Sequence, residues 1–344
     1  MKKIMIIAGR THPKLAQSIS DELNVEEAPL QLTKRIIKDF NNGEINPEVK
    51  ETVAGAELFL IQTSTTGNVN NDLQETLLII DALKRARSKK VFLVQALYPY
   101  ERQDRRETNR KNRPKRKSIA ARVIADQYMS VNLDGIITVE LHAEQIEGFF
   151  PNNCIVENID PSIIFKDYLL KEGIIKEMYE GKKPTIVAPD TGAATRARNF
   201  SEMLGLSAYA IIDKNRTAPG VSEAMYVIGD CKDRDCIIYD DMIDTGTTAI
   251  KSAEKLKEEG ANKVYLLAAH GVFSGSAIDK LANSSFEKII ITDSVPNPAV
   301  DKYPGRFVVL PLAEMLAQVI SNIHNSESLQ PIVNTDQEVE ETTQ

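Results

Sequence analysis

The chain has 344 residues, of which 42% are hydrophobic and 26% charged, so it is long enough for two globular domains with large cores. Its three cysteines, Cys154, Cys231 and Cys236, have no Cys-x-x-Cys spacing, which favours a reducing compartment over a disulfide framework or a zinc site. A net charge of −7 argues against a general nucleic-acid binder, and no run approaches the ~20 apolar residues of a membrane span. We therefore expect a soluble cytoplasmic protein that binds neither nucleic acid nor membrane.

Short apolar runs alternate with helical patterns along the chain. The predicted strands are Ile4–Ala8, Leu58–Gln62, Val91–Gln95, Ile136–Glu140, Thr185–Ala188, Tyr209–Ile212, Cys236–Tyr239, Val264–Ala268 and Ile289–Thr292. The predicted helices are Lys14–Leu23, Asn71–Ala86, Ile119–Tyr128, Ser162–Leu170, Ala194–Leu204, Thr248–Glu259 and Ala277–Ala282. Near-continuous apolar strands separated by helices are typical of parallel sheets, so the pattern predicts an α/β fold with two similar doubly wound, mainly parallel-sheet domains.

A polar break near Asn152–Pro161 divides the chain into halves of similar character. We predict an N-terminal domain over 1–155 and a C-terminal domain over 156–328. The remainder, 329–344, is polar and acidic without apolar periodicity, which predicts a disordered tail. In doubly wound folds, function sits at the carboxyl ends of the strands, and the candidate motifs fall at such ends or in the loops leaving them.

Two segments of the first half suit a nucleotide. Asp39–Glu44 places an aromatic ring beside amide and acid groups, which could sandwich a purine, although a polar turn is the alternative. Tyr100–Asp104 opens a stretch with nine Lys or Arg between Arg102 and Lys117. An RNA-binding patch is one interpretation of that stretch, but a nucleotide-phosphate site or a solvated loop is more economical.

Three further segments carry candidate ligands. A strand ends by presenting Glu140 and His142 at period two, which is a plausible metal or phosphate-side site, although a structural histidine is more common. Asp190 also follows a strand and either holds Mg²⁺ or caps a helix. Asp213–Gly220 carries Lys214 and Arg216 on a Pro-Gly loop, which could close over phosphates or be a solvated basic loop.

The most specific motif is Ile237–Ala249, in which an apolar run ends in Asp240 and Asp241, followed by Asp244 and a Thr-Gly-Thr-Thr turn. The turn and the helix after it offer backbone N–H groups and a positive dipole end to a phosphate, while the acids suit hydroxyls or hydrated Mg²⁺. The sequence thus predicts a pocket for a sugar phosphate.

This motif resembles the phosphoribosyl-binding signature of type I phosphoribosyltransferases. With the other segments, in their order from Ile6 to Ser328, the chain resembles the ribose-phosphate pyrophosphokinase family. The resemblance implies a type I phosphoribosyltransferase-like fold in both domains. It also implies transfer of the diphosphoryl group of ATP to the C1 hydroxyl of ribose 5-phosphate, with release of AMP, and Mg²⁺ as the cofactor. A dimer-built homohexamer is the implied assembly.

The resemblance also assigns roles by position. It implies that Lys214 and Arg216 are catalytic and that His142 and Asp190 hold Mg²⁺. The implied ATP-binding residues are Phe40, Asn42, Gly43, Glu44, Arg102 and Gln103. The implied ribose 5-phosphate-binding residues are Arg216, Asp240, Asp241, Asp244, Thr245, Gly246, Thr247 and Thr248.

The chain departs from the family pattern at Glu140, where the family usually has Asp, and in the Thr-Gly-Ala turn after Asp190. The basic stretch after Asp104, where the family has a regulatory flap, is longer and more basic, and the C-terminus lacks the usual aromatic end. Two alternatives remain. A type I phosphoribosyltransferase would explain only Asp240–Thr248, and a catalytically silent regulatory subunit would be expected to lose the Lys214–Arg216 loop.

Overall fold

The computed structural model describes residues 4–23, 30–31, 37–108, 113–176, 181–206, 208–215 and 224–329. Its contacts divide the chain into two compact units. Unit 1 comprises Met1–Asp160, Ser294–Pro296 and Leu312–Val333, and unit 2 comprises Pro161–Asp293, Asn297–Pro311 and Asn334–Gln344. The domain limits 1–155 and 156–328 remain a prediction. The first unit defined by contacts runs to Asp160 and also includes a segment near the C-terminus, Leu312–Val333.

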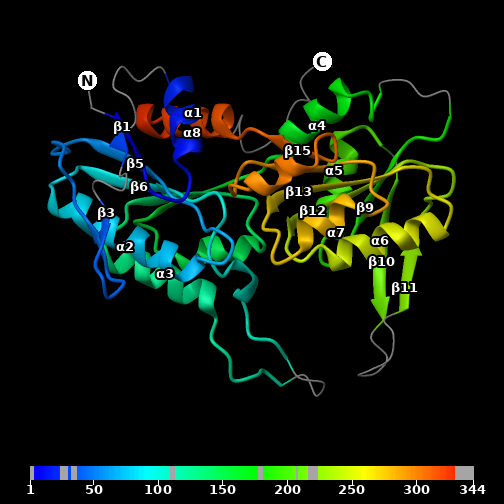
Figure 1. Cartoon of the computed structure of the whole chain (residues 1–344), viewed down its shortest axis with the longest axis horizontal. Coiled ribbons are helices and arrows are strands. Elements are labelled where there is room, and N and C mark those ends of the chain that lie inside the picture. Colours follow the sequence, from blue (N-terminus) through cyan, green and yellow to red (C-terminus); the bar gives the residue numbers. More distant parts are fainter. Residues whose placement is uncertain are drawn as a thin grey trace, which may run out of the picture. The chain divides into compact units, whose positions relative to one another are not determined.

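Unit 1 is built on a six-stranded sheet with the order β2-β1-β5-β6-β7-β8, in which every pairing is parallel. The strands are β1 (Ile4–Ala8), β2 (Leu30–Gln31), β5 (Glu57–Ile61), β6 (Lys90–Val94), β7 (Gly135–Val139) and β8 (Ile155–Ile159). The helices are α1 (Pro13–Glu22), α2 (Val69–Arg85), α3 (Ala120–Ser130) and α8 (Ala313–Asn325), with 3-10 turns η1 (Glu101–Gln103) and η2 (Glu144–Phe149). Helices α1 and α8 pack together on one side of the sheet, and α2 and α3 lie on the other (Figure 1).

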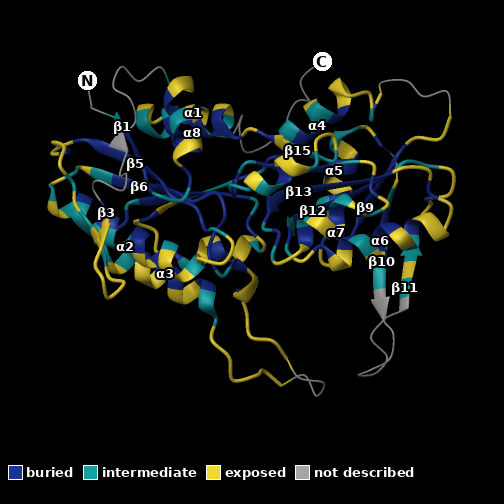
Figure 2. Cartoon of the chain, in the orientation of Figure 1, coloured by how far each residue is buried: buried dark blue, intermediate teal, exposed yellow. Residues whose placement is uncertain are grey.

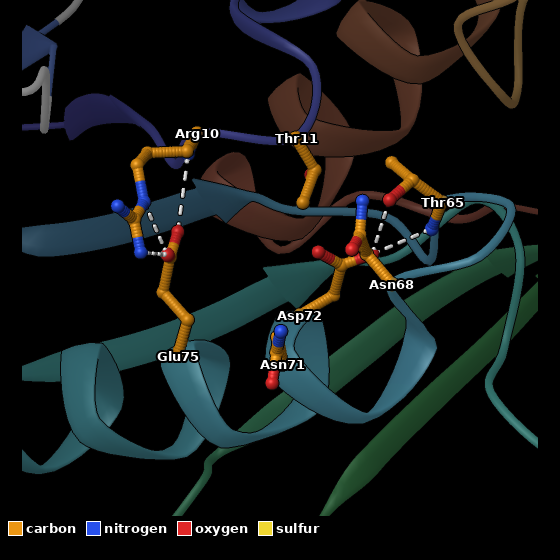
Figure 3. Close-up of a pocket in the computed structure, with 7 residues that line it drawn as sticks. All are labelled: Arg10, Thr11, Thr65, Asn68, Asn71, Asp72 and Glu75. Atoms are coloured by element: carbon orange, nitrogen blue, oxygen red, sulfur yellow. Dashed lines mark hydrogen bonds and ion pairs between the residues drawn. The ribbon is translucent and has the colours of Figure 1, made fainter. Parts of the chain in front are cut away.

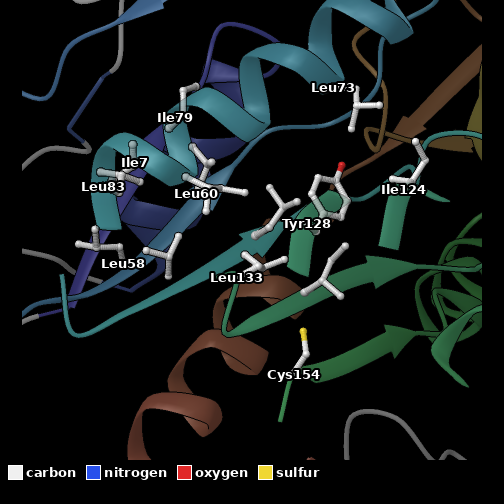
Figure 4. Close-up of a cluster of buried hydrophobic side chains, with 14 of the residues drawn as sticks. Ile7, Leu58, Leu60, Leu73, Ile79, Leu83, Ile124, Tyr128, Leu133 and Cys154 are labelled. Atoms are coloured by element: carbon white, nitrogen blue, oxygen red, sulfur yellow. The ribbon is translucent and has the colours of Figure 1, made fainter. Parts of the chain in front are cut away.

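The central strands of unit 1, β1, β5, β6 and β7, are almost entirely buried because helices cover both faces of the sheet (Figure 2). Successive residues of a strand point to opposite faces. Leu58 and Leu60 of β5 accordingly join Ile79 of α2 in one apolar cluster (Figure 4), whereas Phe59 stacks on Phe92 of β6 with ring centroids 4.9 Å apart. Each such buried side chain stabilises the fold by roughly 1.5–3 kcal/mol.

A small antiparallel hairpin forms its own two-stranded sheet in unit 1, from β3 (Ile37–Asp39) and β4 (Ile45–Pro47). Strand β4 packs against α2. The tip of this hairpin is the segment Phe40–Glu44, one of the two nucleotide candidates of the first half.

Unit 2 contains a seven-stranded sheet with the order β11-β10-β9-β12-β13-β14-β15, in which only β11 is antiparallel to its neighbour. The strands are β9 (Thr185–Ala188), β10 (Tyr209–Asn215), β11 (Ala224–Ile228), β12 (Cys236–Ile243), β13 (Val264–Gly271), β14 (Ile289–Thr292) and β15 (Phe307–Leu310). The helices are α4 (Ser162–Lys171), α5 (Ala194–Met203), α6 (Thr247–Glu258) and α7 (Ala277–Ala282), with a 3-10 turn η3 (Pro298–Lys302).

Both faces of the unit 2 sheet are also covered. Strand β12 contributes Ile238 to one buried cluster and Ile237 and Tyr239 to another. Two mainly parallel sheets with buried faces confirm the predicted α/β class. Within the described part of the chain, no helix has the length and apolar character needed to cross a membrane.

Candidate active site

The predicted sugar-phosphate motif forms the end of β12, the start of α6 and the turn between them. Strand β12 extends beyond the predicted end at Tyr239, because it pairs with β13 as far as Ile243 and Gly271. Asp240 and Asp241 therefore lie inside the strand rather than after it, and Asp244 is the first residue beyond its end. The Asp241 side chain is buried, and its Oδ1 accepts the Met242 N–H at 2.8 Å.

The turn after Asp244 leads directly into α6. Gly246 is the N-cap residue with φ +70°, a left-handed conformation that favours glycine. A Cβ atom at this position would lie 2.9 Å from Cγ of Leu281. Gly246 has no side chain to accept the first N–H groups of α6, and Thr245, Thr247 and Thr248 around it are exposed. Backbone donors, hydroxyls and the helix dipole together form a suitable cradle for a phosphate group.

Acidic groups from two strands share an environment beside this turn. Burial, followed by the neighbouring Asp241, raises the pKa of Asp240 well above its usual range. Asp190 adds to the rise, and Arg196 opposes it. Asp190 follows β9, which pairs with β12, so the carboxyl ends of the two strands bring residues far apart in sequence together. Arg196 was not among the predicted site residues.

Asp190 also caps the start of α5, which was the alternative to metal binding. Its Oδ1 accepts the N–H groups of Gly192 at 2.9 Å and Ala193 at 3.2 Å, just before α5.

The predicted catalytic loop is only partly described. Strand β10 continues to Asn215, and Lys214 is paired in register with Met225 of β11. Arg216 and the rest of the loop to Gly220 lie outside the described residues.

In unit 1, the tip of the β3–β4 hairpin exposes the predicted ATP-binding residues. The Phe40 N–H donates to the Glu44 carbonyl at 2.8 Å, and the Gly43 N–H donates to the Phe40 carbonyl at 2.8 Å. Gly43 has φ +90°, and Asn42 Oδ1 accepts the Glu44 N–H at 3.2 Å. The Phe40 side chain is 54% exposed, so its ring is available for stacking.

The second nucleotide segment lies in η1, after β6. Arg102 and Gln103 are exposed, and the Gln103 N–H donates to the carbonyl of Tyr100 at 2.8 Å. The basic stretch continues from here, and residues 109–112 lie outside the described part of it. Lys115 and Lys117 pair with Glu107 and lower the pKa of that carboxyl to about 2.

His142 is exposed and follows β7 in unit 1, whereas Asp190 belongs to unit 2. Glu140, the residue directly after β7, has φ +45°, a conformation that is costly for a residue other than glycine. No group of three or more His, Cys, Asp or Glu side chains in the described ranges is placed to hold a metal ion.

A pocket that the sequence analysis missed lies at the carboxyl ends of β1 and β5. It has a volume of about 310 Å³ and is lined by Arg10, Thr11, Thr65, Asn68, Asn71, Asp72 and Glu75 (Figure 3). Thr65 donates to Asp72 through its N–H at 2.7 Å and through its hydroxyl. A signal was available, because Gly9-Arg10-Thr11-His12 follows a strand in the same way as the other motifs.

Comparisons with known proteins identify the family of the chain. A family model for the N-terminal domain of ribose phosphate pyrophosphokinase matches residues 4–131, and a phosphoribosyl synthetase-associated domain matches residues 214–333. The ribose-phosphate pyrophosphokinase of Haemophilus ducreyi is 40% identical over 329 residues, which cover 96% of this chain and 98% of that protein. The protein of the same name from Haemophilus influenzae is 40% identical over 334 residues, covering 97% and 100%. The chain belongs to the ribose-phosphate pyrophosphokinase family.

The fold of the family agrees with the structure. The crystal structure of phosphoribosylpyrophosphate synthetase from Mycobacterium smegmatis matches with a TM-score of 0.83 and 34% identity, covering 94% of this chain and 100% of that chain. This match confirms the predicted two-domain, type I phosphoribosyltransferase-like fold.

Proposed function

We propose that the chain is a ribose-phosphate diphosphokinase, which transfers the diphosphoryl group of ATP to the C1 hydroxyl of ribose 5-phosphate. The products are 5-phosphoribosyl 1-diphosphate and AMP, and the reaction would feed nucleotide biosynthesis. Family membership supports the proposal, and the observation that carries it is the uncapped glycine turn at the N-terminus of α6, next to the acids of β12.

The acceptor would bind in unit 2. Backbone N–H groups and hydroxyls of Thr245–Thr248 would hold the 5-phosphate, and Asp240, Asp241 and Asp244 would accept hydrogen bonds from the ribose hydroxyls. These roles agree with their chemistry, because helix N-termini favour anions whereas carboxylates repel them.

The donor would bind through the exposed segments of unit 1. Phe40 would stack on the purine, with Asn42, Gly43 and Glu44 beside it on the hairpin tip, and Arg102 and Gln103 would supply donors from η1. Arginine suits this role because its planar guanidinium both stacks on rings and binds phosphate oxygens.

In the reaction, the C1 oxygen of the sugar attacks the β-phosphorus of ATP, the bond from that phosphorus to the α–β bridging oxygen breaks, and AMP leaves. Lys214 and Arg216 would bind the phosphoryl oxygens on which negative charge grows, and binding of both substrates would hold the groups in line. The C1 hydroxyl loses its proton to solvent or to a neighbouring base.

Mg²⁺ is the cofactor that the family implies, and the donors present fit it. Mg²⁺ is usually held by one or two carboxylates together with waters and substrate phosphates, not by a full protein cage. The resemblance assigns this role to Asp190 in unit 2 and to His142 in unit 1, and each would contribute one donor of the kind that Mg²⁺ sites use. The ion would neutralise phosphate charge, and beside Asp190 it would also oppose the raised pKa of Asp240.

The alternatives are less well supported. A type I phosphoribosyltransferase leaves unexplained the family match over residues 4–131. A silent regulatory subunit leaves unexplained why the chain keeps Lys214 and Arg216. A cytoplasmic location and a dimer-built homohexamer complete the proposal.

The test is direct. Purified protein with ATP, Mg²⁺ and ribose 5-phosphate should release AMP in proportion to ribose 5-phosphate consumed, and absence of AMP would refute the proposal. Lys214→Ala should lower kcat at least 100-fold with little change in substrate affinity, as expected for a group acting mainly in the transition state. Lys280→Ala, on α7 and outside the proposed site, is the matched control and should leave kcat unchanged.

A further inference from the structure

The strand order reverses at one point in the main sheet of each unit. In unit 1 the chain runs from β1 to β2 on one side, and later continues through β5, β6, β7 and β8 on the other side of β1. In unit 2 it runs from β9 to β10 and β11 on one side, and then continues from β12 to β15 on the other side of β9. In open α/β sheets, ligands bind in the crevice beyond the carboxyl ends of the strands at such a reversal.

The two reversal points carry equivalent features. The reversal point of unit 2, between β9 and β12, carries the proposed phosphate cradle at the start of α6. The reversal point of unit 1, between β1 and β5, carries the pocket of about 310 Å³, which is lined in part by Asn68, the N-cap residue of α2. A Thr-Gly pair precedes each helix, Thr66-Gly67 and Thr245-Gly246, and the two glycines have φ +84° and +70°. The unit 1 pocket therefore lies where unit 2 has its cradle, and the proposed reaction makes no use of it.

A carboxylate of the chain itself occupies the anion position of the unit 1 pocket. Asp72 lies in the first turn of α2, and its Oδ2 accepts the Thr65 N–H at 2.7 Å and the Thr65 hydroxyl. Burial raises the pKa of Asp72, and the neighbouring Glu75 adds to the rise, whereas Thr65 and Arg10 oppose it. A phosphate beside this carboxylate would be repelled, so the pocket does not suit an anion.

A cation is also disfavoured, because a positive charge already borders the pocket. Arg10 faces Glu75 at one wall (Figure 3), pairs with it through Nε and the NH2 nitrogen, and donates from its NH1 nitrogen to Asp39 Oδ2 at 2.8 Å. Glu75 also accepts Gln62 Nε2 at its Oε1, at 2.9 Å. Both carboxylate oxygens of Glu75 thus have donors, and the guanidinium beside them would repel a metal ion or an ammonium group.

The groups left for a ligand are two amides and one carboxylate oxygen. Among the described residues, the side-chain amides of Asn68 and Asn71 have no hydrogen-bond partner, and Asp72 uses Oδ2 for Thr65, which leaves its Oδ1. An amide both donates and accepts whereas a carboxylate oxygen accepts, so together they match neighbouring hydroxyl groups. All seven described lining residues are polar, which leaves a nucleobase no ring to stack on, and the volume is at the small end for ligand pockets.

We propose that the unit 1 pocket binds a small, uncharged polyhydroxyl ligand of pentose size, held by Asp72 and by the amides of Asn68 and Asn71. The two units then bind related ligands at equivalent points of their sheets. Unit 2 holds a sugar phosphate on backbone donors, whereas unit 1 holds a sugar without a phosphate on side chains. The inference does not depend on the diphosphoryl transfer, which AMP release tests separately.

The probe is D-ribose, and its binding to the full chain is measured by ligand-observed NMR titration. Ribose 5-phosphate is present at a saturating concentration, so that the proposed acceptor site of unit 2 is filled. Asn71→Ala and Asp72→Asn should each weaken the binding of ribose about fivefold, because each removes a hydrogen bond to a ligand hydroxyl or the charge that strengthens it. Gln74→Ala removes another exposed amide of α2 that does not line the pocket, so it is the matched control and should leave binding unchanged.

The outcomes separate the unit 1 pocket from other sites. Ribose binding that weakens in Asn71→Ala and Asp72→Asn but not in Gln74→Ala supports the inference. Absence of binding to the parent overturns it, as does equal binding by all variants. Ribose that binds only when ribose 5-phosphate is omitted belongs to unit 2, which also overturns the inference. Asn71 is exposed and alanine favours helices, so Asn71→Ala decides the question even where Asp72→Asn does not fold.

Inorganic phosphate tests the charge argument. It is added to the complex of parent and ribose at constant ionic strength, again with ribose 5-phosphate present. Ribose should stay bound, because the carboxylate of Asp72 already takes the anion position. Displacement of ribose by an equal concentration of phosphate would overturn the assignment of an uncharged ligand.

Discussion

Replacing Gly246 with alanine should damage both the stability of unit 2 and its proposed phosphate cradle. Gly246 has φ +70°, where a residue with a Cβ costs about 1–2 kcal/mol. The new Cβ would also lie 2.9 Å from Cγ and 3.0 Å from Cδ1 of Leu281, which is fully buried and has little room to move. Overpacking of this kind adds roughly 1–3 kcal/mol. Together, the two effects predict a loss of about 3 kcal/mol.

Gly173 provides a matched control for the backbone component. It has φ +66° at the end of α4, and a Cβ there would meet nothing within 4 Å. Gly173→Ala should therefore show only the conformational cost of about 1 kcal/mol. Urea denaturation, monitored by a spectroscopic signal from unit 2, measures the free energy of unfolding of each variant. The difference between the two losses of stability is assigned to the contact with Leu281.

A double-mutant cycle tests that assignment. In a Leu281→Ala background the clash is absent, so Gly246→Ala should cost only about 1 kcal/mol, with a coupling of about 2 kcal/mol between the sites. The KM for ribose 5-phosphate should rise in Gly246→Ala because the displaced turn carries Thr245–Thr248. Equal losses for Gly246→Ala and Gly173→Ala, or a cost that is unchanged in the Leu281→Ala background, would refute the reasoning.

Three other predictions concern stability. Arg306 donates to the carbonyl groups of residues 282, 284, 286 and 287, so Arg306→Ala should lower the free energy of unfolding by about 3 kcal/mol, and Arg306→Lys should recover less than half in urea denaturation. His324 Nδ1 lies 2.8 Å from Oε2 of the buried Glu57, so His324→Ala should cost about 1 kcal/mol and lower Tm; an unchanged Tm would contradict this. Burial raises the pKa of Cys236 from 9.0 to about 12. Between these values the native state binds more protons than the unfolded state, so stability should fall as pH rises, and Cys236→Ala should show a shallower fall of the urea midpoint with pH.

The elements predicted from the sequence are those whose local pattern agrees with their burial. Strands Thr185–Ala188 and Ile289–Thr292 are continuous apolar runs with every residue buried, and both were predicted with their observed limits. Strands β8 and β15 are edge strands with exposed Ile155 and Val309, and neither was predicted. The sequence of β8, Ile-Val-Glu-Asn-Ile, is mixed, so its pairing leaves little local signal, whereas the apolar run Phe307–Leu310 of β15 was a signal that the sequence analysis did not use.

The positions of the site residues also depend partly on tertiary pairing, which the local sequence does not show. Asp240 and Asp241 were expected after the end of a strand, because carboxylates usually end an apolar run. They lie within β12 because ladder pairing with β13 continues to Ile243, which is a tertiary effect. The proximity of Asp190 and Arg196 to Asp240 likewise comes from the order of the strands in the sheet, which a linear pattern does not contain.

The two units therefore use their strand ends in different ways. In unit 2 the phosphate cradle is a continuous turn whose donors are backbone N–H groups, so side-chain changes at the exposed Thr245 or Thr247 should matter less than any change at Gly246. In unit 1 the corresponding edge is organised by Arg10, which contacts partners 29 and 65 residues away in sequence. Such an edge depends on side-chain identity at several distant positions at once. Recognition of the acceptor is thus expected to depend on the conformation of the turn and on the carboxylates of Asp240, Asp241 and Asp244 beside it.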